Sequence, residues 1–123
     1  MTVKLISHKP DHIIGIEIDG WISAEDINRL IKLIEPRINT GEKLNVYAEV
    51  NSWTGMSLKA FTEDLKFSLQ HLNDFEKEAI VSDNKWLEAL AAVGNTLFSG
   101  IEVKHFSLNE RDKALQWLGV GNR

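Results

Sequence analysis

The side chains best suited to chemistry in this chain lie together just ahead of a predicted helix. Three hydroxyls, on Ser52, Thr54 and Ser57, stand beside two large apolar side chains, Trp53 and Met56. A hydroxyl at the start of a helix can carry a phosphate, whereas Trp and Met suit an apolar entrance. The segment lacks the glycines of a phosphate-binding loop. The sequence therefore indicates either a polar switch or an apolar entrance at this point.

Constellations typical of enzymes are not found in the sequence pattern. The four histidines lack metal-ligand spacing and the chain has no cysteine, so we expect neither a metal site nor thiolate chemistry. Four carboxylates on predicted strands could meet on one sheet face, but an open, solvated face is a poor place for acid–base catalysis. They are Glu17, Asp19, Glu49 and Glu102. We expect no catalytic residue and no cofactor.

Composition is typical of a single domain that spans residues 1–123. With 43% hydrophobic residues, a chain of this length should bury roughly two-thirds of its unfolded surface. The net charge of −4, with scattered basic residues, argues against nucleic acid and against polybasic attraction to anionic lipid. The first 20 residues resemble neither a signal peptide nor a membrane span. We expect a cytoplasmic protein, either free or peripheral at the membrane.

Strands and helices alternate along the chain. Residues 3–7 and 12–19 predict a β-hairpin, because a Lys-Pro-Asp turn joins them. Ser23 and Asp26 can cap a first helix reciprocally. The later predicted strands are 44–50, 75–81 and 101–106, and the later predicted helices are 57–72, 84–98 and one that begins after Asn109.

The strands alternate between apolar and polar residues, which predicts one polar sheet face. On strand 44–50, for example, Val46 and Ala48 alternate with Tyr47 and Glu49. Parallel sheets covered on both faces usually read as continuous apolar runs, so helices are expected mainly on one side. We predict an α/β fold: a five-stranded, mostly parallel mixed sheet in near-sequential order, with an antiparallel first strand and four main helices largely on one face. Cover of the polar face by a symmetric partner, as in a homodimer, is the alternative.

The second predicted helix carries apolar residues on two opposite sides. At about 100° per residue, Leu58, Phe61 and Leu65 cluster with Leu69 on one side. Phe67 lies nearly opposite, either as an isolated exposed aromatic or as an anchor for an apolar partner.

The third predicted helix is apolar over an unusually wide arc. Leu87, Ala91 and Phe98 extend the stripe that contains Leu90. A helix of this kind needs cover on two sides. Either neighbouring helices or a bound ligand would supply that cover.

Two short motifs resemble the SpoIIAA-like family of small bacterial proteins. They are Gly20-Trp21-Ile22-Ser23-Ala24-Glu25-Asp26 and Ala114-Leu115-Gln116-Trp117-Leu118. The family is related in fold to anti-anti-sigma (STAS) domains and to CRAL-TRIO lipid carriers. In STAS proteins, an acidic residue, two hydroxyl residues and a glycine end the third strand, and the second hydroxyl is phosphorylated. Here Asn51 replaces the acid and Trp53 separates Ser52 from Thr54, so the resemblance to the lipid carriers is favoured.

The resemblance to lipid carriers implies a nonpolar pocket beneath mobile helices. We therefore predict a non-enzymatic carrier of a nonpolar small molecule or lipid, which reaches a membrane surface by helix movement. The predicted ligand-binding residues are Trp53, Met56, Phe61, Phe67, Leu87, Leu90 and Phe98. The alternative is a STAS-like regulatory domain that contacts a protein partner through Ser52, Thr54 and Ser57.

Overall fold

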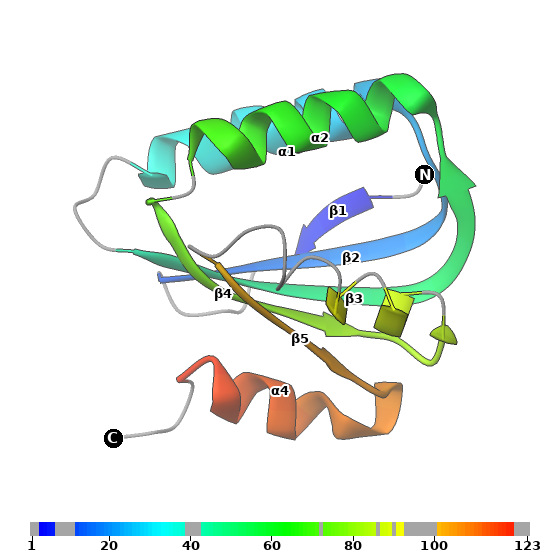
Figure 1. The fold of residues 1–123 in the computed structure, drawn as a ribbon, viewed down its shortest axis with the longest axis vertical. Helices are drawn as coiled ribbons and strands as arrows, with labels where there is room; N and C mark the ends of the chain where they lie inside the picture. Colours follow the sequence, from blue (N-terminus) through cyan, green and yellow to red (C-terminus); the bar gives the residue numbers. More distant parts are fainter. Residues whose placement is uncertain are drawn as a thin grey trace.

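Five strands form one sheet in the order β1-β2-β3-β4-β5 (Figure 1). The computed structural model describes residues 3–6, 12–38, 43–71, 73–85, 87–89, 91–92 and 101–119. The strands are β1 (Val3–Ile6), β2 (Ile13–Ile22), β3 (Leu44–Met56), β4 (Phe75–Val81) and β5 (Glu102–Phe106). Strand β1 is antiparallel to β2, and every other neighbouring pair is parallel. The predicted strand order and the antiparallel first strand are confirmed.

Helices α1 (Ala24–Ile38) and α2 (Leu58–Gln70) cover one face of this sheet (Figure 1). Each connects two parallel neighbours in sequential order, so right-handed crossovers bring both helices to the same face. The predicted capping box begins α1. The amide of Asp26 donates to Ser23 Oγ at 3.2 Å, and the amide of Ser23 donates to Asp26 Oδ2 at 2.9 Å.

The last helix lies on the opposite face, so the expectation of helices largely on one face is wrong for this element. After η1 (Leu108–Glu110), α4 (Arg111–Trp117) packs beneath the sheet in the view of Figure 1. Because α4 follows the final strand and connects no two strands, the handedness rule does not constrain it. Of the predicted helix 84–98, residues 85, 87–89 and 91–92 are helical, and its remaining residues past 84 lie outside the described part of the chain.

Polar and cation–π contacts hold α4 against the face that the sequence predicts to be polar. Buried Asn45 on β3 donates from Nδ2 to the carbonyl of Leu118 at 2.9 Å, and its Oδ1 accepts from the amide of Lys77 at 3.1 Å. The Nζ atoms of Lys77 and Lys104 lie 5.1 and 5.9 Å from the ring centre of Trp117. A helix of the same chain, rather than a symmetric partner, thus covers part of this face.

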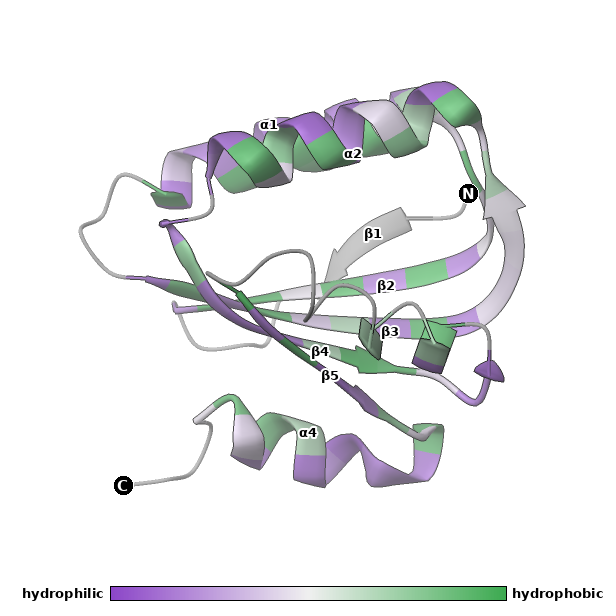
Figure 2. Ribbon diagram, in the orientation of Figure 1, coloured by the Kyte–Doolittle hydropathy of each residue, from purple (hydrophilic) through white to green (hydrophobic). Residues whose placement is uncertain are grey.

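Apolar side chains form one cluster on each side of the sheet. Neighbouring residues on β2 belong to different clusters, because Ile14 faces α1 and α2 while Ile13 faces α4. Figure 2 shows that apolar and polar residues alternate farther along β2. The cluster under α1 and α2 contains Ile14, Ile16, Ile22, Ile27, Ile34, Leu44, Ala60 and Phe75. The cluster under α4 contains Ile13, Tyr47, Ala79, Val81, Phe106, Ala114 and Leu118.

Replacement of Asn45 by Ala should destabilise the protein strongly. The variant leaves the Leu118 carbonyl and the Lys77 amide without their side-chain partner, which should cost about 2 to 4 kcal/mol of unfolding free energy. Urea denaturation followed by circular dichroism measures the change. The matched control is Asn73→Ala at an exposed turn position, which should shift stability by less than about 0.5 kcal/mol. Equal stabilities of the two variants would contradict the bridging role of Asn45.

Candidate functional site

The predicted loop after residue 50 is the continuation of strand β3. Pairing between β2 and β3 persists to Ile22 and Met56, with register shifts at which Asn51 and Thr54 are skipped in the strand pairing. Each such bulge resets the alternation of side chains, so the pattern that marks the strand stops at Val50 although the strand itself does not. The carboxyl ends of β2 and β3 therefore form a paired, bulged ribbon that leads into α2.

The three hydroxyls predicted as a switch have separate surroundings. Ser52 Oγ donates to the Asp19 carboxylate across the ribbon, and Thr54 is exposed. Ser57 caps α2, because its Oγ accepts from the amide of Ala60 at 3.0 Å. Among the described residues, no histidine is hydrogen-bonded to these hydroxyls. The arrangement offers two exposed hydroxyls, on Ser52 and Thr54, whereas Ser57 has a structural role as a helix cap.

The two apolar residues of the segment pack inward. Trp53 and Met56 are half-buried and contact the cluster under α1 and α2. The exposed aromatic at this end is Trp21 instead, whose side chain is 49% exposed. Trp21 lies against Gly55, where an added Cβ would come 3.0 Å from the ring, and the φ of +119° at Gly55 also favours glycine.

Four apolar residues, Leu58, Phe61, Leu65 and Leu69, form a leucine stripe along α2. The helix faces the sheet with the opposite side. Ala60 is fully buried, and Phe67 packs on the cluster beneath, whereas Leu58, Phe61 and Leu69 are 81%, 51% and 54% exposed. The small side chain of Ala60 allows the close approach. Phe67 is thus neither an isolated exposed aromatic nor an outward anchor. The predicted contact residue Phe61 points away from any pocket beneath the helix.

A cavity of about 90 Å³ lies between α1, α2 and the sheet. Its walls are mostly aliphatic and aromatic, and they include Phe67 of the predicted ligand-binding residues. Leu87 is buried but does not line it, while the side chain of Leu90 and all of Phe98 lie outside the described residues. The lining residues are Ile16, Ile27, Leu30, Ile31, Ile34, Val46, Asp64, Phe67, Ser68, Phe75, Lys77, Glu78 and Ile101.

Two carboxyl groups interrupt this apolar wall. Half-buried Glu78 projects from β4, and Asp64 projects from the inner side of α2. Burial, reinforced by the Asp64 carboxylate, raises the pKa of Glu78 to about 7. Desolvation raises the pKa of Asp64 to about 6, although the residue is exposed at the cavity mouth. Among the described residues, neither carboxyl makes a hydrogen bond.

Three of the four carboxylates predicted on the polar face, Glu17, Asp19 and Glu49, accept hydrogen bonds from separate donors. Glu49 accepts from the Tyr47 hydroxyl at 2.8 Å and from Arg111 Nε at 2.9 Å. Burial, followed by the hydrogen bond to Glu49, raises the pKa of Tyr47. Glu17 accepts from Asn51 Nδ2 at 3.1 Å. Glu49 therefore serves as an ion-pair and hydrogen-bond acceptor that links the sheet to α4.

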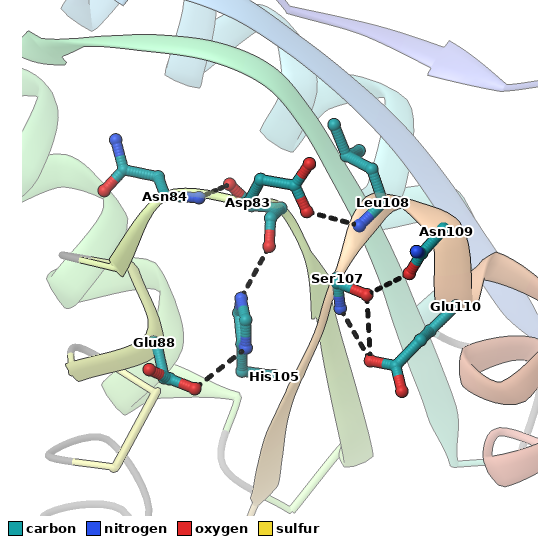
Figure 3. A network of polar contacts seen from close by, with 9 residues as sticks. Asp83, Asn84, Glu88, His105, Ser107, Leu108, Asn109 and Glu110 are labelled. Atoms are coloured by element: carbon teal, nitrogen blue, oxygen red, sulfur yellow. Dashed lines mark hydrogen bonds and ion pairs between the residues drawn. The ribbon is translucent and has the colours of Figure 1, made fainter.

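A polar network joins the ends of β4 and β5 (Figure 3). His105 Nε2 lies 2.7 Å from the carbonyl oxygen of Ser82, and its Nδ1 lies 3.6 Å from a carboxylate oxygen of Glu88. The other members close the turn after β4 or cap η1: Asp83, Asn84, Ser107, Asn109 and Glu110. These contacts fix backbone segments, and buried Ser82 is not available as a nucleophile.

Metal and membrane-spanning features are lacking in the described part of the chain. No group of three or more His, Asp or Glu side chains there is suited to holding a metal ion. None of the helices described is long and apolar enough to cross a membrane.

Sequence reasoning missed Glu78 and the exposed Trp21. Glu78 lies in a predicted parallel strand that β3 and β5 flank, where both faces of a sheet are usually covered. A charged residue in that position was a usable signal. The sequence gives no such signal that Asp64 faces Glu78, because the amphipathic pattern of α2 predicts the opposite orientation of the helix.

Comparisons with known proteins agree on the fold. A family model described as SpoIIAA-like matches residues 13–119. The crystal structure of an uncharacterized protein of the DUF3478 family from Shewanella loihica PV-4, with a SpoIIAA-like fold, superposes with a TM-score of 0.79. That protein is 24% identical, and the alignment covers 95% of this chain and 93% of the other. None of the curated proteins matches this chain.

The orientation of α2 can be tested by two truncations. Phe67→Ala removes a ring that packs on the cluster and on Phe75, 6.2 Å away between ring centres, and should cost about 2 to 3 kcal/mol. Leu58→Ala removes an exposed side chain and should cost less than about 0.5 kcal/mol. Denaturant melts of both variants measure the difference. A larger loss for Leu58→Ala would mean that the leucine stripe is the buried side.

The pH dependence of stability tests the environment of Glu78. The folded pKa of about 7 exceeds the ordinary 4.5, so the unfolded chain binds fewer protons between these values. Stability should therefore fall as the pH rises through this window and level off above it. Glu78→Gln should remove about 1 to 3 kcal/mol of that fall. Denaturation midpoints from pH 4 to pH 9 provide the measurement.

Glu76→Gln is the control for this titration, because Glu76 is exposed on the same strand. That variant should retain the wild-type decline. A Glu78→Gln profile that parallels the wild type would rule out a buried carboxyl at this position.

Proposed function

Because the chain belongs to the SpoIIAA-like family, we propose that it is a non-enzymatic regulatory domain that binds a protein partner at the carboxyl ends of β2 and β3. The sequence predicts the contact with a protein partner at the same segment, through Ser52, Thr54 and Ser57. The two exposed hydroxyls belong to the proposed surface, and Ser57 positions the helix beside it.

An exposed apolar group at this end of the molecule carries the proposal. We call Trp21, Leu58 and Phe61 the docking patch, and their side chains are 49%, 81% and 51% exposed. Trp21 pairs with Gly55, and the amide of Ser57 donates to the carbonyl of Ile22 at 3.0 Å, so backbone pairing joins the ribbon that carries Trp21 to the start of α2 that carries Leu58 and Phe61. Exposed apolar groups with a tryptophan are typical of contact surfaces.

Polar groups border the docking patch on the ribbon side. Ser52 and Thr54 are exposed, and Ser52 is anchored to Asp19. An apolar centre with a hydrogen-bonding rim is typical of protein–protein interfaces. The net charge of −4 gives no general attraction to an anionic membrane. A protein partner therefore fits this surface better than a lipid bilayer.

A second candidate function is the binding of a nonpolar ligand. The cavity between α1, α2 and the sheet favours it, because most of its lining is aliphatic or aromatic. Phe67 supports this role from the inner side of α2, whereas Trp53 and Met56 support it only through the packing around the cavity. A nonpolar molecule that stays bound through purification, detected by native mass spectrometry, is the result that this candidate requires.

Leu58→Asp should abolish partner binding without loss of fold. The change places a charge at the centre of the docking patch, and an acidic residue at the first position of a helix is compatible with the helix dipole. A photo-crosslinking residue at Trp21, used in lysate of the source organism, would identify the partner by mass spectrometry. We expect binding of the purified partner to fall at least about tenfold, as for loss of a hot-spot residue.

Leu33→Asp is the matched control, because Leu33 is 49% exposed on α1 and lies outside the docking patch. It should leave partner binding unchanged. Equal binding by both variants would contradict the proposed surface. Binding to vesicles, lost in Leu58→Asp, in place of a protein partner would show that the patch serves a membrane.

A further inference from the structure

The cavity beneath α2 combines an apolar wall with two carboxyl groups from different elements. Asp64 and Glu78 border it from α2 and β4. Lys77 also borders it, but its Nζ donates to the Trp117 carbonyl at 3.0 Å and lies over the Trp117 ring, toward α4. The carboxyls therefore receive no ion pair from the described lining residues.

We propose that this cavity binds a small amphipathic cation, with its ammonium group at Glu78 and Asp64. The apolar body of the cation would lie against the isoleucines of the lining, which are Ile16, Ile27, Ile31, Ile34 and Ile101. The inference rests on the second candidate function, the nonpolar-ligand carrier, and specifies the charge of its ligand. The polar end of such a ligand is then the feature that selects it.

The size of the cavity limits the ligand to a short body. A single water needs about 10 to 15 Å³ of comparable volume. The cavity of about 90 Å³ is thus several water volumes large. This volume suits an alkyl ammonium of a few carbon atoms. It also suits the ammonium end of a longer alkyl chain whose remainder leaves the cavity near Asp64.

The lining distinguishes three classes of ligand with the same apolar body. A carboxylate would be repelled by Glu78 and Asp64, and a neutral alcohol would leave an ionised carboxyl without a charged partner. An ammonium donates charge-assisted hydrogen bonds to both groups. The raised pKa of Glu78 supports the same preference, because burial and the neighbouring Asp64 carboxylate cause it, and a bound cation would offset both.

The preference should depend on pH through these two carboxyls. On α1, β2 and β3 the described cavity-lining residues are apolar, and Ser68 is the polar neighbour of Asp64 on α2. Lys77 is directed to the α4 side. Below about pH 5 the carboxyls are protonated and the selectivity for a cation should disappear, while the ligand's ammonium stays charged throughout.

The test is a titration of the full-length protein with pentylamine, 1-pentanol and pentanoate at pH 8 and pH 5, followed by two-dimensional NMR of backbone amides. At pH 8 we expect pentylamine to shift the amides around Ile31 and Val46 and to bind about tenfold more tightly than pentanol. Pentanoate should bind weakest. At pH 5, pentylamine and pentanol should bind alike.

Two variants assign the effect. Glu78→Gln and Asp64→Asn should each reduce the preference for pentylamine, and Glu76→Gln, at an exposed position of β4, should retain it. Folding of each variant is checked by circular dichroism. Equal binding of pentylamine and pentanol to the wild type at pH 8 would overturn the cation site while leaving the nonpolar carrier intact. Shifts by none of the three compounds would overturn both, and the protein-docking function would be unaffected.

Discussion

The sequential order of the parallel strands is the constraint on which the rest of this structure depends. Strands β2, β3, β4 and β5 follow one another in the sheet, so each right-handed crossover adds its helix to the same face. The other face cannot be covered by a crossover and falls to α4, which comes after the last strand. This explains why the two faces differ, with aliphatic packing under α1 and α2 and polar contacts between Asn45, Lys77 and α4.

Much of the fold could be predicted from local patterns. The alternation of apolar and polar residues along a strand and the order of strands and helices along the chain can both be read from short segments. The capping box at Ser23 and the two faces of β2 and β3 could be predicted this way. The end of β3 could not, because the bulges at Asn51 and Thr54 break the period of two while pairing continues. The position of α4 could not either, because its partners Asn45 and Lys77 appear in the sequence only as solvated polar residues.

Helix α2 shows where local amphipathicity fails as a guide to a site. Its leucine stripe predicts burial, yet the sheet accepts Ala60 and Phe67, and Leu58 stands in solvent. The spacing of apolar residues in α2 correctly predicts two apolar sides, but it does not tell which of them meets the sheet. Tertiary fit decides that, since a small residue allows closer packing than a leucine. The same choice places Asp64 over Glu78, so the cavity and the docking patch arise from one helix orientation.

The shortness of α4, which is seven residues long, couples its helical structure to its contact with the sheet. An isolated helix of that length is not stable in water, where about 12 to 15 residues are marginal. It is therefore helical only while docked on the sheet, and its undocking and its unwinding are a single event. Amide exchange from α4 then measures how often the Asn45 face of the sheet is opened to water, independently of global unfolding.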